Sequence, residues 1–208
     1  MRRIIKLAAL LAAVTLLLSG CMGLPGMTVQ TDPNATAAPT VEPLTAPVFT
    51  DREAVYEWYN QVNLGDTLED LTARFGEPVV EKSNNGTNYI WKNEAGYGFA
   101  AVFFEDNNKL RAKVIYYDDM RQLKGLSGAT NIAGFATLKK DSDFTMTCMT
   151  LGGKPCELAL IALDSSNNPD TQHLYIWLDE KGSSIQVLFD SDEKVLQVSY
   201  ALDDSTAE

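Results

Sequence analysis

Residues 67–92, TLEDLTARFGEPVVEKSNNGTNYIWK, contain the pattern that decides the fold, a helix followed at once by two strands. Thr67-Leu68-Glu69-Asp70 can cap the helix, and the apolar residues behind it recur on one helical face. Gly76, followed by Pro78, ends the helix. The turn-forming Asn84-Asn85-Gly86 then separates two strand-like runs, residues 79–82 and 88–93. The stretch therefore predicts a helix that leads directly into an antiparallel hairpin.

The flanking sequence extends this pattern to two helices and four strands. On the N-terminal side, Thr50-Asp51-Arg52-Glu53 is a capping-box signature, and apolar residues at helical spacing follow it up to Gly65. On the C-terminal side, residues 98–105 and 109–117 have the composition of strands, with Asp106-Asn107-Asn108 as the turn between them. The predicted order of elements is therefore ααββββ.

The same landmarks return in the second half of the chain, at offsets of 76 to 86 residues. Gly76-Glu77-Pro78 corresponds to Gly153-Lys154-Pro155, and Tyr89-Ile90-Trp91 corresponds to Tyr175-Ile176-Trp177. So many landmarks at a nearly constant offset predict a duplication.

We therefore predict an α+β fold, a tandem duplication of a two-layer ααββββ unit in which two short helices lie on a four-stranded antiparallel sheet. The first repeat is expected over residues 50–119 and the second over residues 120–208. A unit of about 75 residues has a marginal core, so the two halves are expected to pack together or to join their sheets.

The composition is that of a folded protein, because 45% of the 208 residues are hydrophobic and 22% are charged. The formal net charge of −11 argues against nucleic acid as a partner, since phosphate binding needs clustered cations. The chain has one histidine, which excludes metal sites built from several histidines. The sequence shows no Ser/His/Asp set, phosphate-binding glycine loop or motif of paired carboxylates. We predict that the chain is not an enzyme and that it binds no metal or cofactor.

The first 21 residues have the order of a bacterial lipoprotein signal. A basic start precedes an apolar stretch over residues 7–18, which is short for a membrane span. Leu18-Ser19-Gly20-Cys21 resembles a lipobox. The resemblance implies that residues 1–20 are a signal peptide and that Cys21 is diacylated, which would anchor the chain on the extracytoplasmic side of a membrane of the bacterial cell envelope. The alternative is a plain secreted protein with a chance cysteine.

Residues 21–49 are expected to be a linker that begins with the lipidated Cys21. They contain five prolines among Thr, Ala and Gly, and almost no charge. Such a linker is a tether between the membrane and the folded part. After cleavage the chain would keep 14 Lys and Arg against 28 Asp and Glu, a net charge of −14.

The landmarks of the folded part resemble those of the β-lactamase inhibitory protein family and of the small lipoproteins of the outer-membrane β-barrel assembly machine. They are Phe75-Gly76-Glu77-Pro78, Tyr89-Ile90-Trp91 and a strand that ends at Phe104. The second half is also similar to a repeat in lipoproteins of Gram-positive bacteria, through Leu151-Gly152-Gly153 and the run from Tyr175 to Gly182. The resemblance covers roughly residues 50–204 and implies the duplicated fold.

In the inhibitor family, an exposed concave sheet face and one hairpin loop of the first half engage the enzyme. The equivalent hairpin here is residues 93–98, which offers Glu94 and Tyr97 as candidate binding residues. The resemblance therefore implies a protein partner that binds a sheet face and a hairpin loop.

Four aromatic residues are further candidates for binding. Tyr89 and Trp91 alternate onto one face of their strand, as do Tyr175 and Trp177. If that face is uncovered, the rings form a stripe suited to a protein interface. In the alternative arrangement they pack beneath the helices and leave the intervening isoleucines on the other side. The sequence leaves both arrangements open.

Cys148 and Cys156 lie close together in the chain, around the end of the second helix pair. Outside the cytoplasm two such cysteines can form a disulfide, and the alternative is two buried thiols. His173 lies at the start of a strand, where a polar residue is usual. A soft-metal site made with nearby Met and Cys is a minor alternative.

From these features we predict a lipid-anchored extracytoplasmic protein-binding module that presents a sheet face and hairpin loops to another envelope or secreted protein. The expected partners are a membrane, through the lipid on Cys21, and a protein. Two alternatives remain, an inhibitor of a secreted or wall-associated hydrolase such as a β-lactamase, and a structural subunit of envelope assembly.

Overall fold

The computed structural model describes residues 48–201, apart from residues 84–85, 119, 129 and 180–181. The predicted signal peptide, the lipidation site Cys21 and the linker up to residue 47 lie outside the described residues. No described helix combines the length and the apolar character needed to span a membrane.

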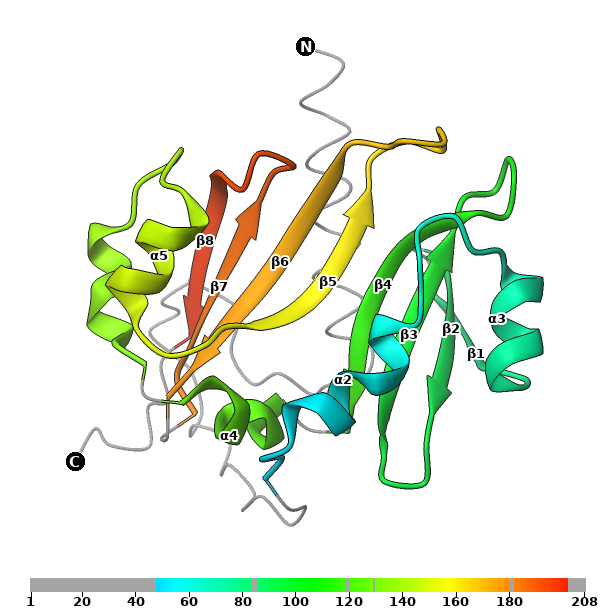
Figure 1. Ribbon diagram of the computed structural model, residues 1–208, viewed down its shortest axis with the longest axis horizontal. Helices are drawn as coiled ribbons and strands as arrows, with labels where there is room; N and C mark the ends of the chain where they lie inside the picture. The colour runs from blue at the N-terminus through cyan, green and yellow to red at the C-terminus, as the bar shows by residue number, and fades with distance from the viewer. Residues whose placement is uncertain (1–47, 84–85, 119, 129, 180–181, 202–208) are drawn as a thin grey trace, which may run out of the picture.

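The eight strands form one antiparallel sheet in which the order in space is the order in the chain, β1 to β8 (Figure 1). The prediction of two tandem two-layer ααββββ units is therefore wrong, because the chain is largely a β fold with a single sheet and a few short helices. The strands are β1 (Val79–Ser83), β2 (Gly86–Lys92), β3 (Tyr97–Phe103), β4 (Leu110–Tyr117), β5 (Cys156–Ala162), β6 (Thr171–Leu178), β7 (Ser184–Phe189) and β8 (Val195–Ala201).

The pairing of β4 with β5 makes the sheet continuous. It consists of three residue pairs, Ala112 with Ile161, Lys113 with Leu160 and Val114 with Ala159. Two separate four-stranded sheets would each leave a long unpaired edge at this place, and the pairing removes both edges. Beyond these pairs the two strands diverge, and α2 and α4 lie at that end of the sheet (Figure 1).

The helices of the first region follow the sequence pattern closely. α2 (Arg52–Asn60) begins after Asp51, whose side chain accepts a hydrogen bond from the backbone N–H of Ala54. α3 (Leu68–Phe75) begins with a capping box between Thr67 and Asp70 and ends at Gly76, which has a φ of 82°.

The helices of the second region are shorter and less regular. After β4 come η1 (Met120–Leu123), α4 (Lys124–Ser127), η2 (Ile132–Thr137) and α5 (Phe144–Leu151). η2 is a 3-10 helix, where the sequence pattern predicted the first helix of a second pair. Its N-cap, Asn131, makes no side-chain capping bond, and Gly134 within it favours no regular helix.

α3, α5 and η2 pack on one face of the sheet, which we call the helix-bearing face. Phe75 of α3 contacts Phe99 of β3, and Phe144 of α5 contacts Phe189 of β7. Phe135 of η2 contacts Tyr200 of β8. Residues that lie opposite one another in the strand register share a face, so these contacts assign every strand position to a face. The other face, which α3, α5 and η2 do not contact, is called the helix-free face. α4 reaches it at one place, where the Ser127 hydroxyl lies 3.7 Å from Sγ of Cys156.

Candidate protein-binding face

The helix-free face carries one continuous row of apolar side chains. The strands alternate between the two faces, and the register places one apolar residue from each of seven neighbouring strands opposite the next. We call these residues the apolar row: Val79, Ile90, Ala100, Val114, Ala159, Leu174 and Leu188. The row ends at Gln197 of β8.

A second set of apolar residues widens the row toward the hairpins at one end of the sheet. Val102, Ala112 and Ile161 lie opposite one another on β3, β4 and β5, and Gln172 of β6 continues their line. The row and this set contain no charged residue, although the chain carries a net charge of −11. The members of this second set on β4, β5 and β6 are buried, between 2 and 4% exposed.

Most members of the apolar row are buried in this structure. Ile90, Val114, Leu174 and Leu188 are between 4 and 8% exposed, whereas Val79 on the edge strand is 56% exposed. The ring contacts of α3, α5 and η2 are all on the opposite face. The rings of α3, α5 and η2 therefore do not cover the row, and its accessible members are Val79 and the half-buried Ala100.

The predicted binding residue Trp91 lies on the helix-bearing face and is 2% exposed. Its ring stacks on Phe99 at 5.0 Å, and Phe75 of α3 closes over Phe99 at 5.1 Å. Its Nε1–H donates a hydrogen bond of 2.7 Å to the carbonyl of Gly76, at the end of α3. Trp91 is thus a core residue in which the polar atom is satisfied.

The other aromatic candidates lie on the same face. Trp177 is fully buried, and the half-buried Tyr175 packs between Phe144 and Phe189. Burial raises the pKa of the Tyr175 hydroxyl well above its usual range. Tyr89 is also half-buried, with its ring 5.4 Å from that of Phe103.

Of the two arrangements that the sequence left open, the structure has the one in which these four rings pack beneath the helices. Ile90 and Ile176 lie on the helix-free face. Because the two tryptophans are buried, they have no surface to offer to a partner in this structure.

In the hairpin of residues 93–98, the two candidate binding residues, Glu94 and Tyr97, differ in their exposure. Asn93 shapes the loop, because its side-chain oxygen accepts from the backbone N–H groups of Ala95 and Tyr97. Glu94 is exposed in the loop. Tyr97 is half-buried, with its ring edge-on to Phe49 at 5.2 Å. Glu94 is therefore the accessible member of the pair.

Of the two alternatives that the sequence left open for Cys148 and Cys156, a disulfide or two thiols, the structure has free thiols. Cys156 is buried, with its Sγ 3.4 Å from the Arg52 guanidinium and 3.7 Å from the Ser127 hydroxyl. Burial raises the pKa of both thiols, which lowers the fraction of reactive thiolate.

His173 pairs with a carboxylate that the sequence analysis did not single out. Its Nδ1 lies 2.9 Å from Oε1 of Glu157, and its ring stacks on Tyr175 at 6.2 Å. Both members of the pair are on the helix-bearing face, on β6 and β5. In the described ranges, no group of three or more His, Cys, Asp or Glu residues is placed to hold a metal ion.

Lys113 is a second buried polar residue that sequence reasoning missed. Its Nζ donates to the carbonyls of Tyr59 and Val62 at the end of α2, at 3.0 and 2.9 Å. Burial lowers the pKa of this ammonium group. The sequence feature that could have revealed this buried lysine is its position between Ala112 and Val114 in a largely apolar strand. Its contacts anchor α2 on the sheet, which is a structural role.

The chain matches no protein-family model and no curated protein. The resemblance that the sequence suggests therefore stays an expectation, and function has to be argued from the geometry of the faces.

Proposed function

We propose that the chain is a lipid-anchored extracytoplasmic protein-binding module, and that its helix-free face is the surface that holds the partner. The observation that carries this proposal is the apolar row, which crosses seven strands without a charged residue. Exposed apolar patches mark sites of protein or membrane interaction, and the members of the row that are accessible in this structure are Val79 and Ala100.

The chemistry of the row suits binding without catalysis. The fully buried centre of a protein interface is depleted of charged residues and is more apolar than the rest of the surface. In the mature lipid-anchored form, the predicted linker of residues 21–49 would hold the folded part away from the membrane, where a partner could reach it.

Affinity capture from the envelope of the native organism tests this proposal, with a charge placed in the row. The bait is the mature chain, and the variant is Ala100→Glu, at a half-buried position of the row on β3. The matched control is Ala73→Glu, on an exposed position of α3. Circular dichroism must first show that all three baits are folded.

The captured protein is then purified and its affinity is measured directly against each form. The proposal expects that the parent chain and Ala73→Glu bind it equally, and that Ala100→Glu binds it at least about tenfold more weakly, because a charge is buried in an apolar contact. Equal binding by a folded Ala100→Glu variant would contradict the proposal, because the partner would then bind another surface of the chain.

A second candidate function is inhibition of a secreted hydrolase, and the exposed Glu94 in the hairpin is the observation that favours it. An exposed acidic residue in a hairpin loop can enter a substrate cleft. Titrating the mature chain against β-lactamases tests this function, with Glu94→Ala as the variant expected to lose inhibition. Full enzyme activity at micromolar concentrations of the mature chain would exclude inhibition for the enzymes assayed.

A further inference from the structure

The outer side of α5 carries two exposed methionines. Thr147 and Leu151 of this helix are 0% exposed, and the ring of Phe144 packs on the sheet. Met146 and Met149 lie on the opposite side of the helix, with exposed fractions of 53% and 74%. Met149 is the most exposed large hydrophobic residue in the part of the chain that the structure describes. Both thioethers are therefore open to small solutes.

Packing on the sheet does not explain these methionines. The N-caps of α3 and α5 occupy the same place in the two regions, because each forms a β-bridge with the lysine that precedes the last strand of its region. Three positions after the cap, α3 has Asp70 where α5 has Met146. Six positions after it, α3 has Ala73 where α5 has Met149. A polar or a small side chain therefore satisfies the fold at these positions.

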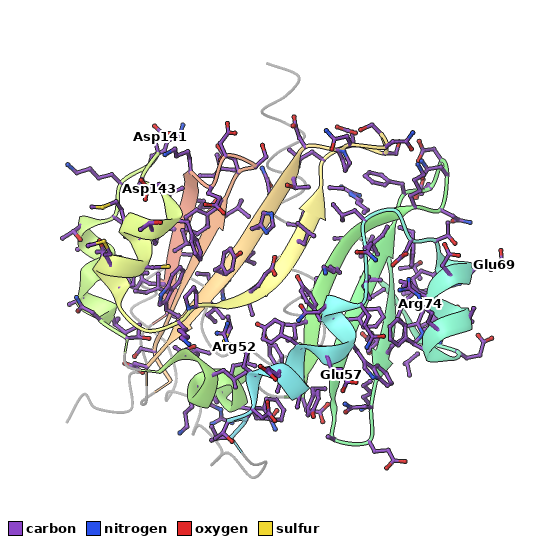
Figure 2. The ribbon with its side chains drawn as sticks, in the orientation of Figure 1. Arg52, Glu57, Glu69, Arg74, Asp141 and Asp143 are labelled. Carbon is purple, nitrogen blue, oxygen red and sulfur yellow. The ribbon has the colours of Figure 1, made fainter. Side chains whose placement is uncertain are left out.

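The hydrogen bonds that hold this turn of α5 are made by the backbone of Met146. The Asp143 carboxylate accepts from its N–H at 2.7 Å, and the Thr150 hydroxyl donates to its carbonyl at 2.8 Å. Figure 2 shows Asp141 and Asp143 beside the start of the helix. A chemical change at the sulfur atom therefore leaves the cap and the helix backbone in place.

Cys148 lies between the two methionines in the chain, but its sulfur is less available. It is half-buried and packs against the core cluster that contains Trp177 and Phe189. Burial raises the pKa of the Cys148 thiol, so less of the reactive thiolate is present at neutral pH. A thioether has no proton to lose, so its reaction with an oxidant does not depend on pH in this way. Met146 and Met149 are therefore the accessible sulfur groups of α5.

We propose that Met146 and Met149 form a methionine-oxidation site for peroxides, at which both side chains become sulfoxides while the chain stays folded. The thioether sulfur attacks one oxygen of hydrogen peroxide, the O–O bond breaks and an S–O bond forms. The sulfur gives two electrons to the peroxide, and the second oxygen leaves as water with the two peroxide protons. In the reverse change, a dithiol removes the oxygen as water and is oxidised to a disulfide.

Oxidation changes the outer side of α5 from apolar to polar, because a sulfoxide replaces an apolar thioether with a polar group. α5 packs on the helix-bearing face, so the site lies away from the proposed binding face. The inference therefore does not rest on the proposed function. A reversible sulfoxide at an exposed position consumes oxidant without the loss of the fold.

Peptide mass spectrometry of the chain treated with hydrogen peroxide tests the proposal. The protein is the mature chain from residue 21 with Cys21→Ser and Cys148→Ser, so that neither thiol consumes oxidant. Each methionine is compared with itself in concentrated urea, where the chain is unfolded. Folding is expected to slow the oxidation of Met149 by less than about twofold and that of Met146 by less than about threefold, in the order of their exposure. Protection of either thioether by more than about tenfold would overturn the proposal.

A matched variant tests whether the fold survives oxidation. Met146→Leu with Met149→Leu keeps two apolar side chains of similar volume that peroxide does not oxidise. After peroxide treatment, the parent chain and this variant are expected to unfold at the same urea concentration. A lower midpoint in the treated parent alone would contradict the claim that the chain stays folded.

Repair by methionine sulfoxide reductases, with a dithiol as the reductant, tests reversibility on the folded chain. Both sulfoxides are expected to return to methionine, because the two side chains are exposed. Sulfoxides that are reduced only after the chain is unfolded in urea would overturn the reversible role of this site.

Discussion

The region of β1–β4 and the region of β5–β8 differ in how each accommodates a buried tryptophan. Both place it on their second strand, on the helix-bearing face. In the first region, the indole N–H of Trp91 donates to the carbonyl of Gly76 at 2.7 Å. In the second, Nε1 of Trp177 is buried and finds no hydrogen-bond acceptor among the described residues.

The two regions diverge at the end of the preceding helix. Gly76-Glu77-Pro78 follows α3, whereas Gly152-Gly153-Lys154-Pro155 follows α5 and is one residue longer. Two successive glycines there have positive φ, 69° and 62°, so the chain leaves α5 along another path. The two tryptophans therefore lie on the second strand of their regions in different polar environments.

Replacing either tryptophan by alanine is expected to have the largest effect. Trp91→Ala and Trp177→Ala should each lower the free energy of unfolding by about 3–5 kcal/mol, because both rings are core. Urea unfolding followed by circular dichroism measures the loss. A variant that keeps its full stability while losing a partner would show that its ring is a surface group after all.

Replacement by phenylalanine sharpens the comparison. Trp91→Phe removes a satisfied indole N–H and leaves the Gly76 carbonyl without its donor, whereas Trp177→Phe removes an N–H that has no acceptor. Trp91→Phe should therefore be more destabilising than Trp177→Phe by about 1–2 kcal/mol, measured by urea unfolding. Equal losses would mean that the Trp177 N–H is satisfied in solution.

Tyr59 offers a smaller test, because the sequence landmarks align it with Phe135 of the second region. Its hydroxyl is buried without a hydrogen-bond partner in the described part of the chain. Tyr59→Phe should raise the free energy of unfolding by about 1 kcal/mol at neutral pH. A loss of stability of similar size would show that the hydroxyl is bonded.

The same variant has a pH dependence of known sign. Burial raises the pKa of Tyr59 well above its ordinary value of 10.0. Above pH 10 the unfolded chain releases the proton that the folded chain keeps, so the parent chain loses stability as the pH rises. Tyr59→Phe should make that alkaline loss less steep in urea titrations above pH 10.

The start of each region's last helix gives the smallest effect. In α3, Asp70 is hydrogen-bonded to the backbone and side chain of Thr67, which lowers its pKa, whereas Met146 holds the same position in α5. The contribution of ionised Asp70 to stability is present above the ordinary pKa of an aspartate and is lost as the pH falls through the lowered pKa. Asp70→Ala should reduce stability at pH 7 but not in strong acid, and Met146→Ala should show no such pH dependence.

Local helices and strands could be predicted from the sequence where capping or turn-forming residues mark their ends. The capping box at Thr67 and the stop at Gly76 fix α3, and Asn84-Asn85-Gly86 separates β1 from β2 at the expected place. These signals act between near neighbours in the chain. They hold whatever the rest of the fold is.

The joining of the sheet and the choice of face could not be predicted in the same way. Val114 pairs with Ala159 across a long connection, and nothing local to either strand encodes that pairing. β4 is apolar on both faces, with Ala112 and Val114 on one and Ile115 and Tyr117 on the other, so alternation does not say which face the helices cover. The apolar row was missed for this reason.

Thiol labelling in the intact envelope tests most directly whether a partner covers the helix-free face. A cysteine is introduced as Ala100→Cys in the row or as Ala73→Cys on α3, in a chain with Cys148→Ser, and each is treated with a maleimide in cells and after purification. The account predicts that Ala100→Cys is protected in the cells and labelled in the purified chain, while Ala73→Cys is labelled in both. Equal labelling of Ala100→Cys in cells and after purification would contradict it.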